Sequence, residues 1–514
     1  MKKYLLLFIM AVFAMSCSKK VEVKGKITGG SPLDRVEFIE ASGVATLPLV
    51  NLGLDKNGNF SGSFEAPKDG MYEISYGEKR NIIYLKAGQT LNISGNGATF
   101  PMEYVITGDA KKNNEFFVAT QKYLGTYAQQ ANVPDLLKKD EKAFLQGVQK
   151  IDSDINKNIE ENVKKFNPDK DIVEWKKMDV SSTVLTIMAQ YEMMKKMEGG
   201  PAFKVTKAFS DYEEKLQVDK DKMLKTSPIY RSYLLNKYNT DFQKFAEPKV
   251  AKNPNVTLSE LFAEFLRNQK DTPQLKKDYL LSFILAQDIR PGADPKAIER
   301  ISKIVDEDIK DAGVKKSLKD LHLAIAGVKV GEVAPEASLI KQDGKSYKIS
   351  EGKGKPNMLV FYTSWNPYIA EATVPILKEV VNFYKSKMNF TFINLDDTKD
   401  QFVKTSNALL KGIPGVNVYG EGGLNSDIAK KYGIYGFKLP CFVVIDKDGK
   451  IASRSFVNVG EQELVTILDK QTGLSAPKVN PNIQLQQGGM MVDPTQPAQP
   501  QPAQPANPQP APGK

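Results

Sequence analysis

The chain has 514 residues, of which 41% are hydrophobic, a length that accommodates about three domains at roughly 150 residues each. Its net charge is +10, but basic and acidic residues are interleaved and no dense basic block with aromatic neighbours occurs, so a role in binding nucleic acid is disfavoured. The single histidine excludes metal sites built from clustered histidines, and we expect neither a metal nor a cofactor.

The N-terminus has the pattern of a secretion signal. Lys2 and Lys3 precede an apolar run at residues 4–13, and small residues then lead to Cys17. The run is about half as long as the ~20 residues that a membrane-spanning helix needs, and no later segment is both long and uncharged enough to qualify. We therefore expect residues 1–16 to be a signal peptide and the rest of the chain to have no transmembrane helix.

The position of Cys17 resembles the lipobox of bacterial lipoproteins, although Ala14 and Met15 stand where that pattern usually has leucine and a small residue. The resemblance implies a membrane anchor of several acyl chains, palmitate among them, on Cys17. Such an anchor is effectively permanent, since each buried methylene adds roughly 0.8 kcal/mol. The resemblance implies the cell envelope of a Gram-negative bacterium, and, because no aspartate directly follows Cys17, lipoprotein sorting by analogy favours the outer membrane, facing the periplasm, over the inner one. The alternative is an ordinary secretory signal with an unmodified cysteine.

Residues 17–110 are predicted to form a small antiparallel β-sandwich. Short β-prone runs are separated by Gly, Asn and Asp residues that favour turns. The segment resembles the β-rich N-terminal domain that precedes thioredoxin-like domains in many lipoproteins of Bacteroidetes, a resemblance that implies no chemistry. The predicted strands lie at residues 21–27, 36–39, 71–76, 81–85 and 90–94, with a turn at 55–60 that leads into a further strand.

Residues 111–327 are predicted to be an α-helical domain, because long segments of helical period are separated by prolines and glycines. A run of methionines near its middle is interpreted as helix packing, with an adaptable binding face as the alternative. The single His322 lies in a lysine-rich helical stretch, which favours a structural role over a serine-histidine-acid triad. The clearest helices are predicted at residues 141–166, 180–197, 258–267 and 296–312, and the methionines are Met188, Met193, Met194 and Met197.

Residues 328–473 alternate between strands and helices, as in a sheet that is covered on both faces. The continuous apolar run at 358–362 is typical of a buried central strand. The other predicted elements are a helix at 370–384, strands at 390–395 and 442–445, a turn at 446–449, a strand from Ile451 and a helix at 461–468.

This last region resembles the thioredoxin superfamily, in particular its envelope thioredoxin-like and peroxiredoxin-like branch. The resemblance rests on the strand at 359–363, Trp365 directly after it, the helix that follows, and the segment 432–440 that leads into 441–451. It implies a C-terminal α/β thioredoxin-like domain.

Active members of the superfamily carry a Trp-Cys-x-x-Cys segment at the start of this helix, where the helix terminus stabilises a thiolate. Here Asn366 and Ile369 stand at the two cysteine positions, and neither side chain can exchange a disulfide. Val360 also stands where some thioredoxins have a buried acid. We therefore expect a domain without redox catalysis.

Pro440 matches the cis-proline that lies beside the active site in this superfamily. Its retention without the cysteines implies that the groove persists as a peptide-binding surface, whereas the alternative is a turn that the fold requires. The predicted binding residues are Trp365, Asn366, Pro367, Tyr368 and Pro440.

Cys441 would be the only free thiol after lipidation of Cys17, so no internal disulfide is expected. It is either a small buried apolar residue or a lone thiol that forms mixed disulfides with a partner. The paired acids Asp396 and Asp397 end a strand and are weak candidates for meeting a cation. The preferred function is binding or scaffolding of a protein or peptide partner. The alternative is a thiol-disulfide or peroxide-reducing oxidoreductase that works through Cys441 alone.

Residues 474–514 are rich in Pro, Gln and Ala. Such a segment lacks the apolar residues for a core, and we expect a disordered tail with polyproline bias. A spacer or a ligand for a partner are its possible roles.

Overall fold

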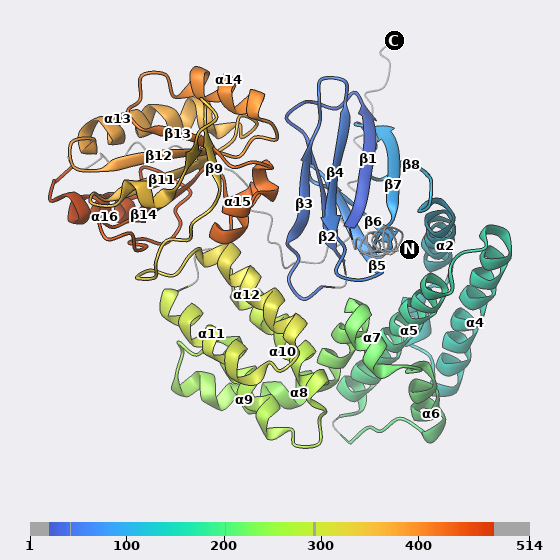
Figure 1. Ribbon diagram of the computed structural model, residues 1–514. Coiled ribbons are helices and arrows are strands. Elements are labelled where there is room, and N and C mark those ends of the chain that lie inside the picture. The colour runs from blue at the N-terminus through green and yellow to red at the C-terminus, as the bar shows by residue number, and fades with distance from the viewer. Residues whose placement is uncertain (1–19, 42, 201, 291–293, 477–514) are drawn as a thin grey trace, which may run out of the picture.

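A computed structural model describes residues 20–41, 43–200, 202–290 and 294–476. The predicted signal peptide, Cys17 and residues 477–514 of the predicted tail lie outside the described residues. Among the helices that are described, none combines the length and the apolar character needed to cross a bilayer. Figure 1 shows three regions in chain order, a β-sandwich, a helical region and a C-terminal α/β region, so the predicted multidomain fold class is confirmed.

The N-terminal region is a sandwich of two four-stranded sheets, with strand orders β4-β1-β7-β8 and β3-β2-β5-β6. Every neighbouring pair is antiparallel except β1 and β7, which run parallel. Alternate residues of β1 point into the core between the sheets, which explains its period of two. The strands are β1 (Lys20–Thr28), β2 (Arg35–Glu40), β3 (Pro48–Gly53), β4 (Asn59–Glu65), β5 (Gly70–Tyr76), β6 (Lys79–Leu85), β7 (Thr90–Asn96) and β8 (Val105–Thr107).

The helical region follows directly. Its helices are α2 (Lys111–Gln130), α3 (Val133–Leu137), α4 (Glu141–Phe166), α5 (Lys170–Gly199), α6 (Lys207–Leu216), α7 (Lys220–Thr226), α8 (Pro228–Lys252), α9 (Leu258–Asn268), α10 (Gln274–Asp288), α11 (Pro295–Asp308) and α12 (Ala312–Ala326).

The helix predicted at 296–312 is wrong at its end, because α11 stops at Asp308 and α12 begins at Ala312. The cause is a cap: the side chain of Asp311 accepts a hydrogen bond from Val314 N at 3.0 Å and so starts the new helix. The methionines of the predicted run differ in their exposure to solvent: Met188 is fully buried, whereas Met197 is 80% exposed.

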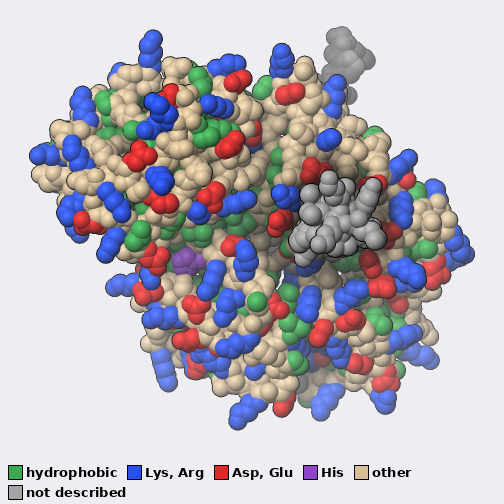
Figure 2. Space-filling view, in the orientation of Figure 1, with side chains coloured by type: hydrophobic (Ala, Val, Ile, Leu, Met, Phe, Trp, Pro, Cys, Tyr) green, Lys and Arg blue, Asp and Glu red, His purple; other side chains and the backbone are tan. Residues whose placement is uncertain are grey.

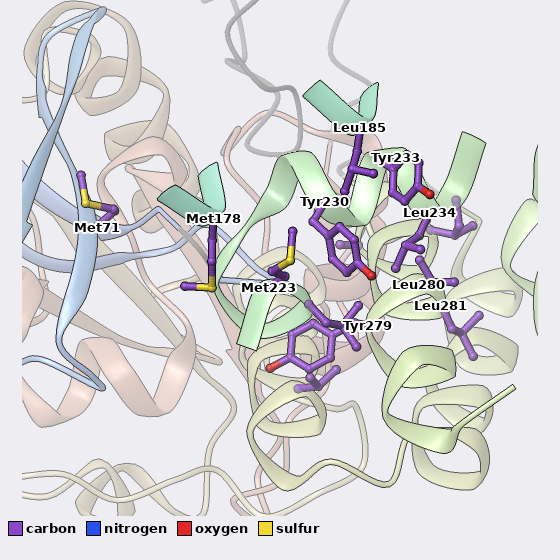
Figure 3. Packing of buried hydrophobic residues seen from close by; sticks show 14 of the residues in the cluster. Met71, Met178, Leu185, Met223, Tyr230, Tyr233, Leu234, Tyr279, Leu280 and Leu281 are labelled. Carbon is purple, nitrogen blue, oxygen red and sulfur yellow. The ribbon is translucent and has the colours of Figure 1, made fainter. Parts of the chain in front are cut away.

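The outer face of one sheet of the sandwich joins the hydrophobic core of the helices. Met71 of β5, Tyr84 of β6 and Leu47 belong to the same cluster of buried residues as the helices. Figure 3 shows Met71 projecting from its strand toward Met178 and Met223. The outer face of one sheet is therefore covered by helices and not by solvent.

The C-terminal region is a six-stranded sheet of order β10-β9-β13-β12-β11-β14. β12 runs parallel to β11 and β13, and β14 runs antiparallel to β11. Successive residues of β11 enter two different buried clusters, one on each face of the sheet, as a doubly covered strand requires. The strands are β9 (Leu339–Lys341), β10 (Ser346–Tyr347), β11 (Asn357–Tyr362), β12 (Asn389–Asn394), β13 (Val416–Tyr419) and β14 (Cys441–Ile445).

The helices of this region are α13 (Val374–Tyr384), α14 (Lys399–Leu409), α15 (Asp427–Tyr432) and α16 (Gln462–Thr472), with short helical turns η1 (Ile349–Gly352), η2 (Ile369–Thr373), η3 (Gly423–Asn425) and η4 (Gly436–Lys438). The strand predicted from Ile451 is wrong. Ile451 forms only an isolated bridge with Ile445, because the side chain of Ser453, and not a backbone carbonyl, accepts the hydrogen bond from Val444 N.

The edge of the second sheet is closed by an asparagine. Asn114 of α2 accepts a hydrogen bond from Tyr84 N and donates one to Tyr84 O, both at 2.8 Å. These are the backbone groups that a further strand would otherwise pair with, so the side chain covers an edge that would be exposed for unwanted pairing.

We expect Asn114→Ala to destabilise the protein by at least about 2 kcal/mol, because two buried backbone groups lose their partners. The measurement is the urea midpoint of unfolding followed by circular dichroism. Asn156→Ala is the matched control, since Asn156 bonds only to Asp152 of its own helix. Equal midpoints for the two variants would contradict the edge-covering role.

Candidate functional site

Asn366 holds the segment before α13 against the loop that contains Pro440. Its Nδ2 donates a hydrogen bond to Leu439 O at 2.7 Å, and its Oδ1 accepts one from Tyr368 N at 2.9 Å. The side chain is buried, and the Leu439–Pro440 peptide bond is cis. The amide therefore connects the two segments that form the floor of the predicted groove.

Ile369 is, after Asn366, the second residue that is predicted to stand at a cysteine position, and its side chain is 2% exposed. It begins the π-helical turn η2 and packs in the core with Leu377 of α13. Neither Asn366 nor Ile369 presents a reactive atom, so the chemistry of this segment is confined to hydrogen bonding and apolar contact.

Trp365 is half-buried beneath an arginine from the sandwich. The guanidinium carbon of Arg35, at the start of β2, lies 4.7 Å from the centre of the indole ring, a cation–π geometry. Arg35 also donates two hydrogen bonds to Asp397, at 2.5 and 2.7 Å, just beyond β12. The cation that pairs with Asp397 is therefore the guanidinium group of Arg35.

A second contact joins the same two regions. Asn425 of η3 accepts a hydrogen bond from Asn51 N at 3.1 Å and donates one to Asn51 O at 3.0 Å. The side chain of Asn51 accepts from Arg35 Nε at 2.6 Å and donates to Glu37 at 2.5 Å. A continuous polar chain therefore runs from Glu37 through Asn51 and Arg35 to Asp397.

The solvent-accessible part of the predicted site is aromatic. Pro367 is exposed, Tyr368 is 44% exposed and Phe437 of η4 is 53% exposed. The ring of Phe437 stacks on Tyr435 with centroids 5.8 Å apart. Pro440, by contrast, is buried, so it supports this surface from below.

Cys441 is fully buried at the start of β14. Burial raises the pKa of its thiol, and the nearby Lys438 opposes this only in part. Burial also lowers the pKa of Lys438, whose Nζ has no hydrogen-bond partner. A neutral thiol without access to solvent is unsuited to attack a disulfide or a peroxide.

The residues that the structure describes give little support to a histidine-based catalytic triad or to a metal site. His322 Nδ1 lies 2.9 Å from Ser302 Oγ, but no acid is bonded to the histidine, and burial lowers its pKa. No group of three histidine, cysteine or carboxylate side chains that could hold a metal ion occurs in the described ranges.

Sequence reasoning identified the five binding candidates but missed Arg35, Asp397 as its partner, and Phe437. The sequence could have indicated Phe437 as a binding candidate, since it is an aromatic residue in the loop directly before Pro440. It gave no such indication for Arg35, because Arg35 lies 362 positions from Asp397.

Comparisons with known proteins concern the C-terminal region. Residues 329–468 match a family model described as Redoxin, whereas no curated protein matches the chain. Solved structures include the C-terminal domain of a protein described as a thiol-disulfide oxidoreductase from Bacteroides thetaiotaomicron, 29% identical over 28% of this chain and 97% of that one, with a TM-score of 0.25. The thioredoxin domain of a thiol-disulfide oxidoreductase from Bacteroides vulgatus is 20% identical over 28% of this chain and 99% of that one, with a TM-score of 0.25. The match of residues 329–468 to Redoxin agrees with a thioredoxin-like fold of the C-terminal region.

We expect Cys441 in the folded protein to react with iodoacetamide on the order of 100-fold or more slowly than in the unfolded chain, because its thiol is buried and protonated. A Cys17→Ser variant makes Cys441 the single thiol, and intact mass follows the reaction. Rapid alkylation of the folded variant would contradict this and would favour an oxidoreductase that works through Cys441.

Proposed function

We propose that this chain is a lipid-anchored protein of the cell envelope whose thioredoxin-like domain binds an extended segment of a protein partner and performs no redox chemistry. The observation that carries the proposal is the hydrogen bond from Asn366 to Leu439 O. A position that needs a reactive sulfur in a redox enzyme is here committed to holding the groove together.

The proposed contact surface is formed by Pro367, Tyr368 and Phe437. Exposed aromatic rings on a rigid support are suitable anchors for binding, because they bury a large area at low entropic cost. Trp365 and Asn366 hold this surface from below, and Pro440 lies beneath it. The bound segment is expected to be extended and to carry apolar side chains.

An oxidoreductase is the competing function, favoured by the match of residues 329–468 to Redoxin. It would have to operate through Cys441 alone with an external thiol to resolve the mixed disulfide. The burial of Cys441 and the raised pKa of its thiol argue against it.

The membrane is the other proposed partner, through acyl chains on Cys17. The preceding residues 1–16 have the composition of a signal peptide, and the outer membrane facing the periplasm is the proposed location. On the face that Figure 2 shows, basic and acidic side chains are interspersed over all three regions. A lipid anchor therefore accounts for membrane association without requiring a large patch of one charge.

Peptides selected from a random phage library on the full chain should lose at least about tenfold in affinity when Tyr368 and Phe437 are both replaced by Ala, because each removes an aromatic anchor. Fluorescence polarisation of the selected peptides gives the affinities. Phe383→Ala is the matched control, since Phe383 is a 39% exposed aromatic residue on α13. Unchanged affinity in the double variant would place peptide binding elsewhere.

Metabolic labelling with an alkyne analogue of palmitate should mark the wild-type protein in its native host. Cys17→Ser should abolish the label, because the thioether would have no sulfur to form on. Cys441→Ser, which changes the other cysteine, should keep it. Retention of the label in Cys17→Ser would refute the lipid anchor.

A further inference from the structure

A cleft of about 270 Å³ lies where all three regions meet, apart from the aromatic surface described above. Figure 1 shows β3, α12 and α15 converging at this junction. Sites for drug-sized ligands occupy about 300–1,000 Å³, so this cleft suits a smaller molecule. Its polar and aromatic lining includes Glu37, Asn51, Lys316, Asp320, Lys430 and Tyr435.

Glu37 is the enclosed charge of the cleft. One carboxylate oxygen accepts the hydrogen bond from Asn51, and no donor in the described part of the chain is bonded to the other. Burial raises the pKa of Glu37, and the hydrogen bond from Asn51 and the charges of Arg35 and Arg80 oppose this only in part. A cationic group in the cleft would supply the missing partner at the free oxygen.

The lysines that line the cleft are Lys316 and Lys430. Lys316 is neutralised by Asp320 at 2.6 Å, one turn away on α12. Lys430 of α15 is exposed and forms no ion pair with any residue that the structure describes. The lining of the cleft thus includes a half-buried carboxylate, Glu37, and an exposed ammonium, Lys430, without an ion pair among the described residues.

Between these charges the walls are apolar. Leu49, Leu323, Leu424 and Ile434 line the cleft together with the ring of Tyr435. Burial raises the pKa of Tyr435 to about 12, so its hydroxyl stays neutral. A short aliphatic side chain is the group that this wall would shield from water.

We propose that the cleft binds a small zwitterion with an aliphatic side chain, of the α-amino-acid class, with its ammonium on Glu37 and its carboxylate toward Lys430. The buried contact at Glu37 supplies most of the affinity, because charge-assisted hydrogen bonds are strong away from water. The exposed contact at Lys430 adds orientation and little affinity. This site is distinct from the peptide surface at Tyr368 and Phe437, although Tyr435 of its wall stacks on Phe437.

The test is calorimetric titration of the full chain in detergent with three probes that share the isobutyl side chain of leucine. L-Leucine carries both charges, 3-methylbutylamine carries only the ammonium, and 4-methylpentanoate carries only the carboxylate. We expect L-leucine and the amine to bind at one site per chain and the carboxylate to show no binding.

Glu37→Gln should lower the affinity for L-leucine and for the amine by at least about tenfold. The matched control is Glu260→Gln, since Glu260 is a half-buried glutamate that pairs with Arg300 and does not line the cleft. Lys430→Met, at an exposed position, should weaken the affinity for L-leucine by up to about fivefold and leave the affinity for the amine unchanged. This selective effect would not arise from misfolding.

Three results would overturn the proposal. One is the absence of binding heat from both L-leucine and the amine at about 10 mM, beyond the millimolar range of weak sites. Another is equal affinity in the wild type and Glu37→Gln. The third is binding of 4-methylpentanoate as tight as that of L-leucine.

Discussion

The guanidinium of Arg35 fixes the sandwich to the thioredoxin-like domain. Its side chain is 10% exposed and that of Asp397 is 30% exposed, so the pair gives up most of its hydration. Such burial is offset only by good geometry and further hydrogen bonds. Both conditions hold, because the pairing is bidentate, Asn51 accepts from Nε, and the indole of Trp365 covers one face. The planar fork sets the orientation of the two regions as well as their distance.

The hydrogen bonds of Asn366 order the segment before α13 in a similar way. Asn366 forms two directional hydrogen bonds where a cysteine would offer one weak donor. The loop before Pro440 is thereby bonded from within the protein. Trp365, which in a redox enzyme would flank a reactive centre, is instead held between its own domain and Arg35.

Much of the fold could be predicted from the sequence, because the periodic patterns are local. The helix at 141–166 coincides with α4, where Asp140 caps a strongly amphipathic segment. The break at Asp311 also carried a local signal, an aspartate ahead of a new apolar run. The contact of Arg35 with Asp397 carried none, since ordinary charged residues distant in the chain become partners only through the fold. Likewise, the asparagine at position 366 is visible in the sequence, but its bond to Leu439 could not be predicted.

The core that Met71, Tyr84 and Leu47 share with the helices bears on how this architecture is inherited. The thioredoxin-like domain fills both faces of its sheet with its own residues. It can therefore be exchanged between genes as a unit once its contacts around Arg35 and those of Gly433 and Tyr435 with the helical region are matched. The sandwich and the helical region have no such freedom. A recombination point near residue 110 would divide one hydrophobic interior between two genes. The two regions are therefore expected to be inherited together.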